Sequence, residues 1–108
     1  MINSKQKARL LSNWEHRETL TTNAEVRIHD PNSEWQCYLI AMNPQNDDEV
    51  YAMVVGWYPE VCMWELSSLM ASYNEDGEHP IIDNTFRPCN AGDLLRKLKD
   101  NIDGYKRD

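Results

Sequence analysis

The stretch that decides the fold runs from Trp35 to Trp57 and reads WQCYLIAMNPQNDDEVYAMVVGW. Apolar residues fill both alternating sets of positions from 35 to 42 and again from 50 to 57, and a polar segment rich in turn-forming residues separates them. Strands that are apolar on both faces are typical of the middle of a sheet, so we predict a central β-hairpin here. On its first strand, the two predicted faces are Trp35, Cys37, Leu39, Ala41 and Gln36, Tyr38, Ile40, Met42.

Shorter strands are predicted on either side of this hairpin. Residues 26–29 alternate apolar and polar side chains, and a turn signal follows at 30–33. After Pro59, a short apolar run at 61–64 predicts another strand. The chain from 79 to 88 is expected to be irregular, with one short strand in it.

Three helices are predicted around the strands. The first has Ser4 as its cap and a stripe at helical spacing of Ala8, Leu11 and either Trp14 or Glu15. The second carries its stripe at Leu66, Leu69, Met70 and Tyr73. The last follows a capping pattern at Asn90 and Asp93 and buries Leu94, Leu95, Leu98 and Ile102. The sequence therefore predicts a single α+β domain over residues 1–108, with a small, mostly antiparallel sheet of three to five strands flanked by these helices.

Composition sets the broad class of the protein. With 108 residues, 41% of them hydrophobic and 27% charged, the chain is expected to bury one ordinary core. No apolar run approaches the roughly 18 residues of a membrane span, and the polar start lacks the apolar core of a signal peptide, so we expect a cytoplasmic protein. The three cysteines are expected to be reduced, with Cys37 and Cys62 as small core residues.

The most informative feature is the distribution of charge. The net charge is −7, which argues against direct binding to nucleic acid or to an anionic membrane. No Lys or Arg occurs between Arg27 and Arg87. Eleven acids lie in that interval: Asp30, Glu34, Asp47, Asp48, Glu49, Glu60, Glu65, Glu75, Asp76, Glu78 and Asp83. One interpretation is a solubilising surface, and the other is an acidic face that docks on a basic protein.

The second interpretation leads to a set of candidate partner-binding residues. The acids cluster at 47–49, which we place at the tip of the hairpin, and at 75–78. Trp57 and Tyr58 lie at a strand end, where exposed aromatic side chains serve as anchors for a partner. The predicted site is therefore Asp47, Asp48, Glu49, Glu75, Asp76 and Glu78, with Trp57 and Tyr58 as apolar anchors. We expect the partner of such a site to be a basic, nucleic-acid-binding protein, toward which this chain acts as a decoy for nucleic acid.

Signals for catalysis are weak. The chain has no Gly-x-Ser-x-Gly elbow and no phosphate-binding glycine loop, and its three histidines share no metal-ligand spacing. We therefore expect no catalytic residue, no metal and no cofactor. Two alternatives stay open: a module that self-associates, as a homodimer, through an open sheet edge, and a small hydrolase or modifying enzyme with His79 as its base.

Several short motifs in this order resemble a known family. They are Asp30-Pro31, Ser33-Glu34-Trp35-Gln36-Cys37-Tyr38, Asp47-Asp48, Tyr51 to Gly56, Glu65 to Leu69 and Asp83 to Pro88. Across roughly residues 25 to 95 the chain is similar to the domain of unknown function family 2958, small proteins common on plasmids and other mobile elements. Cys37 stands where that family usually has an aromatic residue, and Tyr51-Ala52 replaces its Phe-Gly. The resemblance implies a protein carried by a plasmid or phage, and such accessory proteins include anti-CRISPR and anti-restriction inhibitors; it implies no catalytic residue.

Overall fold

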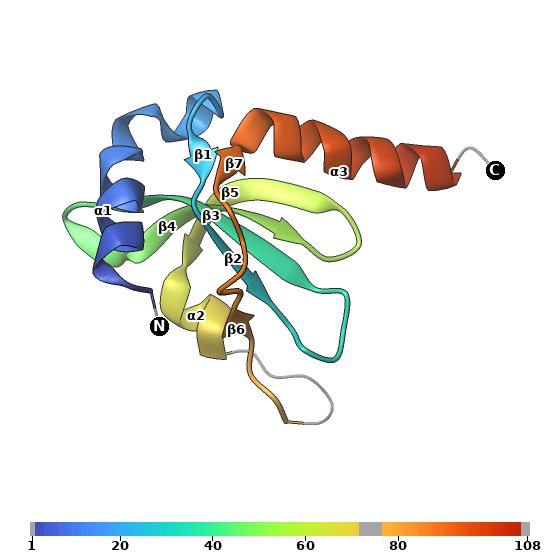
Figure 1. The fold of residues 1–108 in the computed structure, drawn as a ribbon, viewed down its shortest axis with the longest axis horizontal. Coiled ribbons are helices and arrows are strands. Elements are labelled where there is room, and N and C mark those ends of the chain that lie inside the picture. Colours follow the sequence, from blue (N-terminus) through green and yellow to red (C-terminus); the bar gives the residue numbers. More distant parts are fainter. Residues whose placement is uncertain (1, 72–76, 107–108) are drawn as a thin grey trace.

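The centre of the fold is a five-stranded antiparallel sheet in the order β5-β4-β3-β2-β6 (Figure 1). The computed structural model describes residues 2–71 and 77–106. The strands of this sheet are β2 (Val26–His29), β3 (Gln36–Asn43), β4 (Asn46–Val55), β5 (Pro59–Glu65) and β6 (Ile81–Ile82). A second, two-stranded sheet pairs β1 (Asn23–Ala24) with β7 (Cys89–Asn90). The helices are α1 (Ser4–Ser12), the 3₁₀ helix η1 (Trp14–Thr19), α2 (Leu66–Ala71) and α3 (Ala91–Lys106). The predicted α+β class and the flanking helices are confirmed.

The sheet is covered on both faces, as the apolar pattern of the hairpin predicts. One face packs against Leu10 of α1 and Leu69 of α2, both of them buried. The other face packs against Ala91 of α3, together with the half-buried leucines that follow it on the same helix. Leu39 and Ile40, neighbours on β3, are both fully buried, one on each face. β3 is therefore the central strand of the core.

A bulge in β3 changes the predicted faces of that strand. The pairing with β4 shifts between Leu39 and Ala41, so Ile40 is the extra residue. Ile40 and Ala41 consequently lie on the same face, and Met42 returns to the face of Leu39. The prediction of strict alternation is correct up to Ile40 and wrong beyond it, because an inserted residue shifts the alternation by one position.

Three local predictions need correction. The cap of α1 is Asn3 and not Ser4, because the side chain of Asn3 accepts a hydrogen bond from the Gln6 backbone N–H at 2.7 Å and Gln6 caps in return. The buried residue of that helix is Leu10, whereas Ala8 is exposed. Cys37 is buried, and burial raises the pKa of its thiol to about 12. Cys62, in contrast, is exposed, because it lies on the edge strand β5.

The last helix begins where the sequence predicts. Asn90 accepts a hydrogen bond from the backbone N–H of Asp93 at 2.9 Å and so caps α3. Leu69 of α2 is buried, while Tyr73, predicted for the same stripe, lies outside the described residues. No helix in the described part of the chain combines the length and the apolar run needed to cross a membrane.

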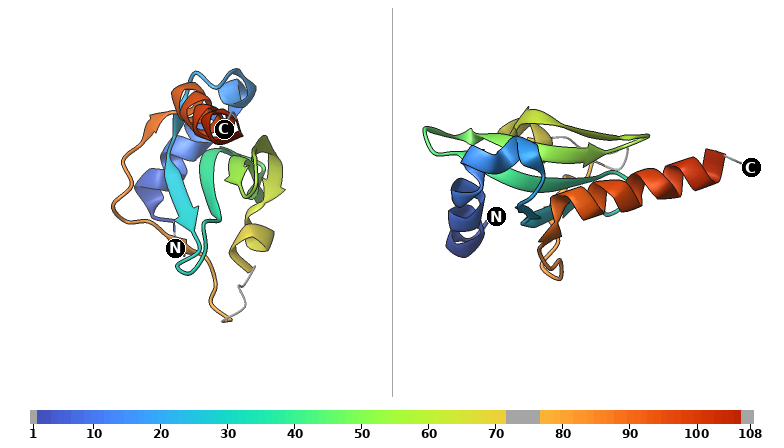
Figure 2. Two further views of the ribbon diagram at one scale, coloured as in Figure 1. Left: turned by 90° about the vertical axis from the view of Figure 1, so that its right-hand side faces the viewer. Right: turned by 90° about the horizontal axis from the view of Figure 1, so that it is seen from above.

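The sheet has two distinct ends (Figures 1 and 2). The β3–β4 turn lies beside α1 at one end, and the β2–β3 and β4–β5 connections lie together at the other. The last turns of α3 project past that second end of the sheet. Because α3 leaves the sheet there, a hollow opens between the helix and the strand ends.

Candidate functional site

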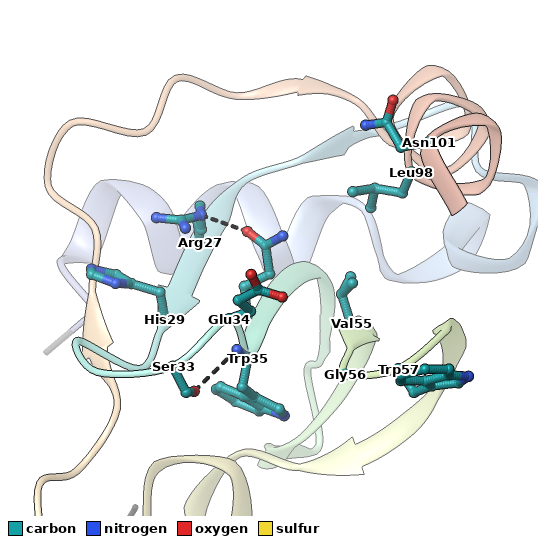
Figure 3. A pocket seen from close by; sticks show the side chains of 11 residues that line it. Arg27, His29, Ser33, Glu34, Trp35, Val55, Gly56, Trp57, Leu98 and Asn101 are labelled. Carbon is teal, nitrogen blue, oxygen red and sulfur yellow. Dashed lines mark hydrogen bonds between the residues drawn. The ribbon is translucent and has the colours of Figure 1, made fainter. Parts of the chain in front are cut away.

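A groove of about 800 Å³ occupies this hollow (Figure 3). Its floor is built from the ends of β2, β3 and β4, and Leu98 and Asn101 of α3 form one wall. The lining residues are Arg27, His29, Ser33, Glu34, Trp35, Gln36, Val55, Gly56, Trp57, Leu98 and Asn101.

Strand register explains why polar side chains reach this groove. Val26 and Ile28 are buried on the face of α1, so their neighbours Arg27 and His29 point to the opposite face. His29 pairs with Gln36, and Gln36 pairs with Val55 on the next strand. The three side chains therefore form one row across the sheet, at the end where the groove lies.

The positive charge of Arg27 is paired with a carboxylate of the same protein. Its Nη1 donates to Oδ2 of Asp83 at 2.8 Å, and its Nε donates to Oε1 of Gln36 at 3.0 Å. The hydroxyl of Tyr38 donates to the same Gln36 oxygen at 2.8 Å. Both members of the ion pair are less than one-third exposed. The groove is therefore not a ready anion site, because its one arginine is neutralised within the fold.

Asp83 holds this network together. Its Oδ1 accepts hydrogen bonds from the hydroxyl and the backbone N–H of Thr85, at 2.6 and 2.8 Å. These two bonds, followed by the hydrogen bond and charge of Arg27, lower the pKa of Asp83 from 3.8 to about 2.

The pKa of Asp83 predicts a specific acid sensitivity. A carboxylate whose folded pKa is depressed contributes stability above its unfolded pKa and loses it as the pH falls through the folded value. We expect Asp83→Asn to lose less stability than the wild type between pH 3.8 and about 2. Urea unfolding followed by tryptophan fluorescence at several pH values measures this. Asp100→Asn, an exposed acid of α3, is the control, and equal pH dependence in the wild type and Asp83→Asn would contradict the assignment.

The rim of the groove carries the most exposed tryptophan of the described chain. Trp57 lies at the tip of the β4–β5 hairpin and is 85% exposed, and its neighbour Tyr58 is 43% exposed. Trp35 lies across the groove, half-buried, with one side packed against the core (Figure 3). Glu34 stands beside it, exposed to solvent. The sequence predicts Trp57 and Tyr58 as surface anchors, and both side chains lie where a partner could reach them.

The acids at 47–49 are placed differently from the prediction. The turn of the β3–β4 hairpin is Pro44-Gln45, so Asp47, Asp48 and Glu49 belong to the first part of β4 and not to the tip. Asn46 and Val55 mark the ends of β4, which puts these acids about 30 Å from Trp57 at ~3.4 Å per residue. The structure therefore does not bring the predicted acids and the predicted anchors together.

Two of these acids have partners within the fold. Oδ2 of Asp47 accepts from Nζ of Lys7 on α1 at 3.3 Å. Asp48 accepts two hydrogen bonds from Ser67 at the start of α2, from the backbone N–H at 2.7 Å and from the hydroxyl at 2.8 Å. Glu49 lies opposite Glu65 of β5, and like charges in that position repel each other.

Asp48 is therefore expected to stabilise the fold. Because it satisfies a free N–H at the start of α2, Asp48→Ala should lower the free energy of unfolding by about 0.5–2 kcal/mol, as loss of a helix cap does. Asp47→Ala, which removes only an exposed ion pair, should change it by less than about 0.5 kcal/mol. Chemical denaturation of both variants measures the difference. Equal stabilities would contradict the capping role.

The third predicted cluster is only partly described. Glu78 is exposed, and its Oε2 accepts from Nδ2 of Asn32 in the β2–β3 turn at 2.7 Å. This contact places Glu78 beside the β2–β3 turn, at the groove end of the sheet. Glu75 and Asp76 lie outside the described residues.

The sequence reasoning did not identify the groove itself. Its walls come from segments as far apart in the sequence as Arg27 and Asn101. The alternation at 26–29 was the available signal, since it places Arg27 and His29 on the face opposite Val26 and Ile28. Within residues 2–71 and 77–106, no group of three or more His, Cys, Asp or Glu side chains is arranged to hold a metal ion. The groove combines two tryptophans, Trp35 and Trp57, with polar side chains of the strand ends.

Comparison of the chain with protein-family models, with curated proteins and with solved structures found no match. The resemblance to the domain of unknown function family 2958 therefore stays a prediction from the motifs.

Proposed function

We propose that this chain is a non-enzymatic binding protein that docks on a basic, nucleic-acid-handling protein. The observation that carries the proposal is Trp57, a large apolar side chain that is 85% exposed on the rim of a groove. Binding hot spots are enriched in Trp, Tyr and Arg, and they lie in well-packed pockets of an interface. An exposed tryptophan beside an open groove is the arrangement that a partner would use.

Charge supports a basic partner. The groove end of the sheet carries Glu34, Glu60 and Glu78, all exposed, and no Lys or Arg occurs in the sequence between Arg27 and Arg87. Arg27 itself is neutralised by Asp83. Long-range attraction by such a surface would steer a positively charged protein toward Trp57 and raise the rate of association.

Proteins that handle nucleic acids have the most basic surfaces, because they neutralise phosphates. The proposal therefore names a CRISPR effector or a restriction enzyme as the kind of target, with this chain occupying part of its nucleic-acid channel. The resemblance to mobile-element proteins agrees with that role. Asp47 and Asp48 are left out of the proposed site, because they bond Lys7 and Ser67 within the fold. Glu34 and Glu60 take their place as the acids that contact the partner.

Affinity capture tests the proposal. The tagged protein is incubated with a lysate of its host, washed at low and at high salt, and the retained proteins are identified by mass spectrometry. We expect one stoichiometric, basic, nucleic-acid-binding protein that is lost at high salt, because screening weakens attraction between exposed charges. Retention of the same partner at both salt concentrations, or of none, would contradict it. Glu34→Gln should weaken retention, and Glu15→Gln, an exposed acid of η1, is the matched control.

A further inference from the structure

The strand β5 ends the five-stranded sheet with an open edge. β5 pairs with β4 along one side, and among the described residues no other strand pairs with it. The opposite edge of the sheet is β6, which is only two residues long. In the left view of Figure 2, β5 is the outermost strand of the sheet on its side. The backbone N–H and C=O groups of alternate residues along this seven-residue strand therefore face away from the sheet.

This edge carries few of the features that protect edge strands from pairing. Natural edges carry charged side chains, above all Lys, or Pro, bulges or a covering element, or they are very short. β5 has no Lys, and its charged residues, Glu60 and Glu65, lie only near its ends. The pairing of β5 with β4 runs without a shift from Pro59 to Glu65, and Pro59 is confined to the first position. The middle of the strand is Val61-Cys62-Met63-Trp64, in which Cys62 is exposed and Met63 is 37% exposed.

The charge around the edge selects the kind of strand that would fit. Glu60 and Glu65 are exposed near its two ends, and Glu49 lies opposite Glu65 on β4. No cation occurs in either strand. A second copy of this chain would bring the same acids of another protein of net charge −7 alongside these, which costs free energy. A basic strand would relieve the repulsion between Glu49 and Glu65 and satisfy the open backbone groups.

From this we infer that β5 receives an extended, basic segment of the partner as a sixth strand of the sheet. The inference rests on the proposed function and specifies how the partner binds. Backbone hydrogen bonds to β5 give affinity, and lysines or arginines of the segment contact Glu60 at one end and Glu65 with Glu49 at the other. Trp57 and Tyr58 lie directly before β5, so the tip would hold the body of the partner while its strand lies along the edge.

A pair of synthetic peptides tests strand addition directly. The first is a soluble peptide as long as β5, with two adjacent lysines at each end and valines between them, so that lysines point to both faces of the sheet, as Glu60 and Glu65 do; the second has the same sequence with the central backbone nitrogens methylated, which removes hydrogen-bond donors but no charge. We expect the methylated peptide to bind at least about tenfold more weakly, because several backbone hydrogen bonds are lost. Glu60→Gln together with Glu65→Gln should weaken binding of the first peptide, and Glu15→Gln should not.

Each other outcome has a definite meaning. Equal affinity for the two peptides would overturn strand addition and leave a purely electrostatic contact. Failure of both peptides to bind, while the basic partner is still captured in a salt-dependent way, would overturn the inference alone. A concentration-dependent dimer in sedimentation, with β5 amides protected from hydrogen exchange, would assign the edge to a second copy and overturn it as well.

Discussion

Replacing Trp57 by alanine is expected to weaken binding to the basic partner by about 30-fold or more, the loss typical of a hot-spot residue. The side chain is 85% exposed and lies at a hairpin tip, so its removal deletes contact surface without opening a cavity in the core. The free energy of unfolding should therefore change by less than about 0.5 kcal/mol. Isothermal titration with the captured partner, beside urea unfolding of the free protein, measures both quantities.

The matched control for this variant is Ile81→Ala. Ile81 is also a large, exposed apolar residue, at 48%, but it lies on β6 at the other edge of the sheet. The Ile81→Ala variant should bind the partner with the affinity of the wild type. If Trp57→Ala binds within threefold of the wild type, the tip of the hairpin is not the anchor.

The largest effect on stability is expected for Leu39→Ala. Leu39 is fully buried in the middle of the central strand β3, and its loss leaves a cavity between tightly paired neighbours. We expect the free energy of unfolding to fall by about 2–5 kcal/mol, which is a large part of what a domain of this size has. Met63→Ala on the edge strand, where the side chain is 37% exposed, should cost about 1 kcal/mol or less. A similar cost for the two variants would show that β3 is not the centre of the core.

The central hairpin and the class of the fold could be predicted because their signals are local. Apolar residues on both faces of 35–42 and 50–57 require a sheet covered on two sides, and α1, α2 and α3 supply the cover. The start of α3 could be predicted for the same reason, since Asn90 and Asp93 are only three residues apart. The bulge at Ile40 could not be predicted, because nothing in the residue pattern distinguishes an inserted residue from regular alternation.

The roles of the acids could not be read from the sequence, because they depend on distant partners. Asp47 meets Lys7 over a separation of 40 residues, and Asp48 meets Ser67 over 19. A cluster of charges therefore looked like a free surface although two of its members are engaged. The anchors Trp57 and Tyr58 were easier to predict. Gly56 and Pro59 lie on either side of them and mark them as part of a hairpin turn.

The groove could not be predicted from the sequence, because its shape is a property of the assembled fold. Its shape depends on where α3 leaves the sheet, and the strand order sets that position. The ends of β2, β3 and β4 meet Leu98 and Asn101 there. Only the assembled fold places Trp35, Glu34 and Trp57 around one hollow (Figure 3).

The most direct test of the central claim is amide hydrogen exchange of the protein, free and in complex with its captured partner. The account predicts new protection over residues 56–65, which span the Trp57 tip and the open edge of β5, with unchanged exchange in α1 and β6. Protection confined to α1 or β6, with residues 56–65 exchanging as they do in the free protein, would contradict it.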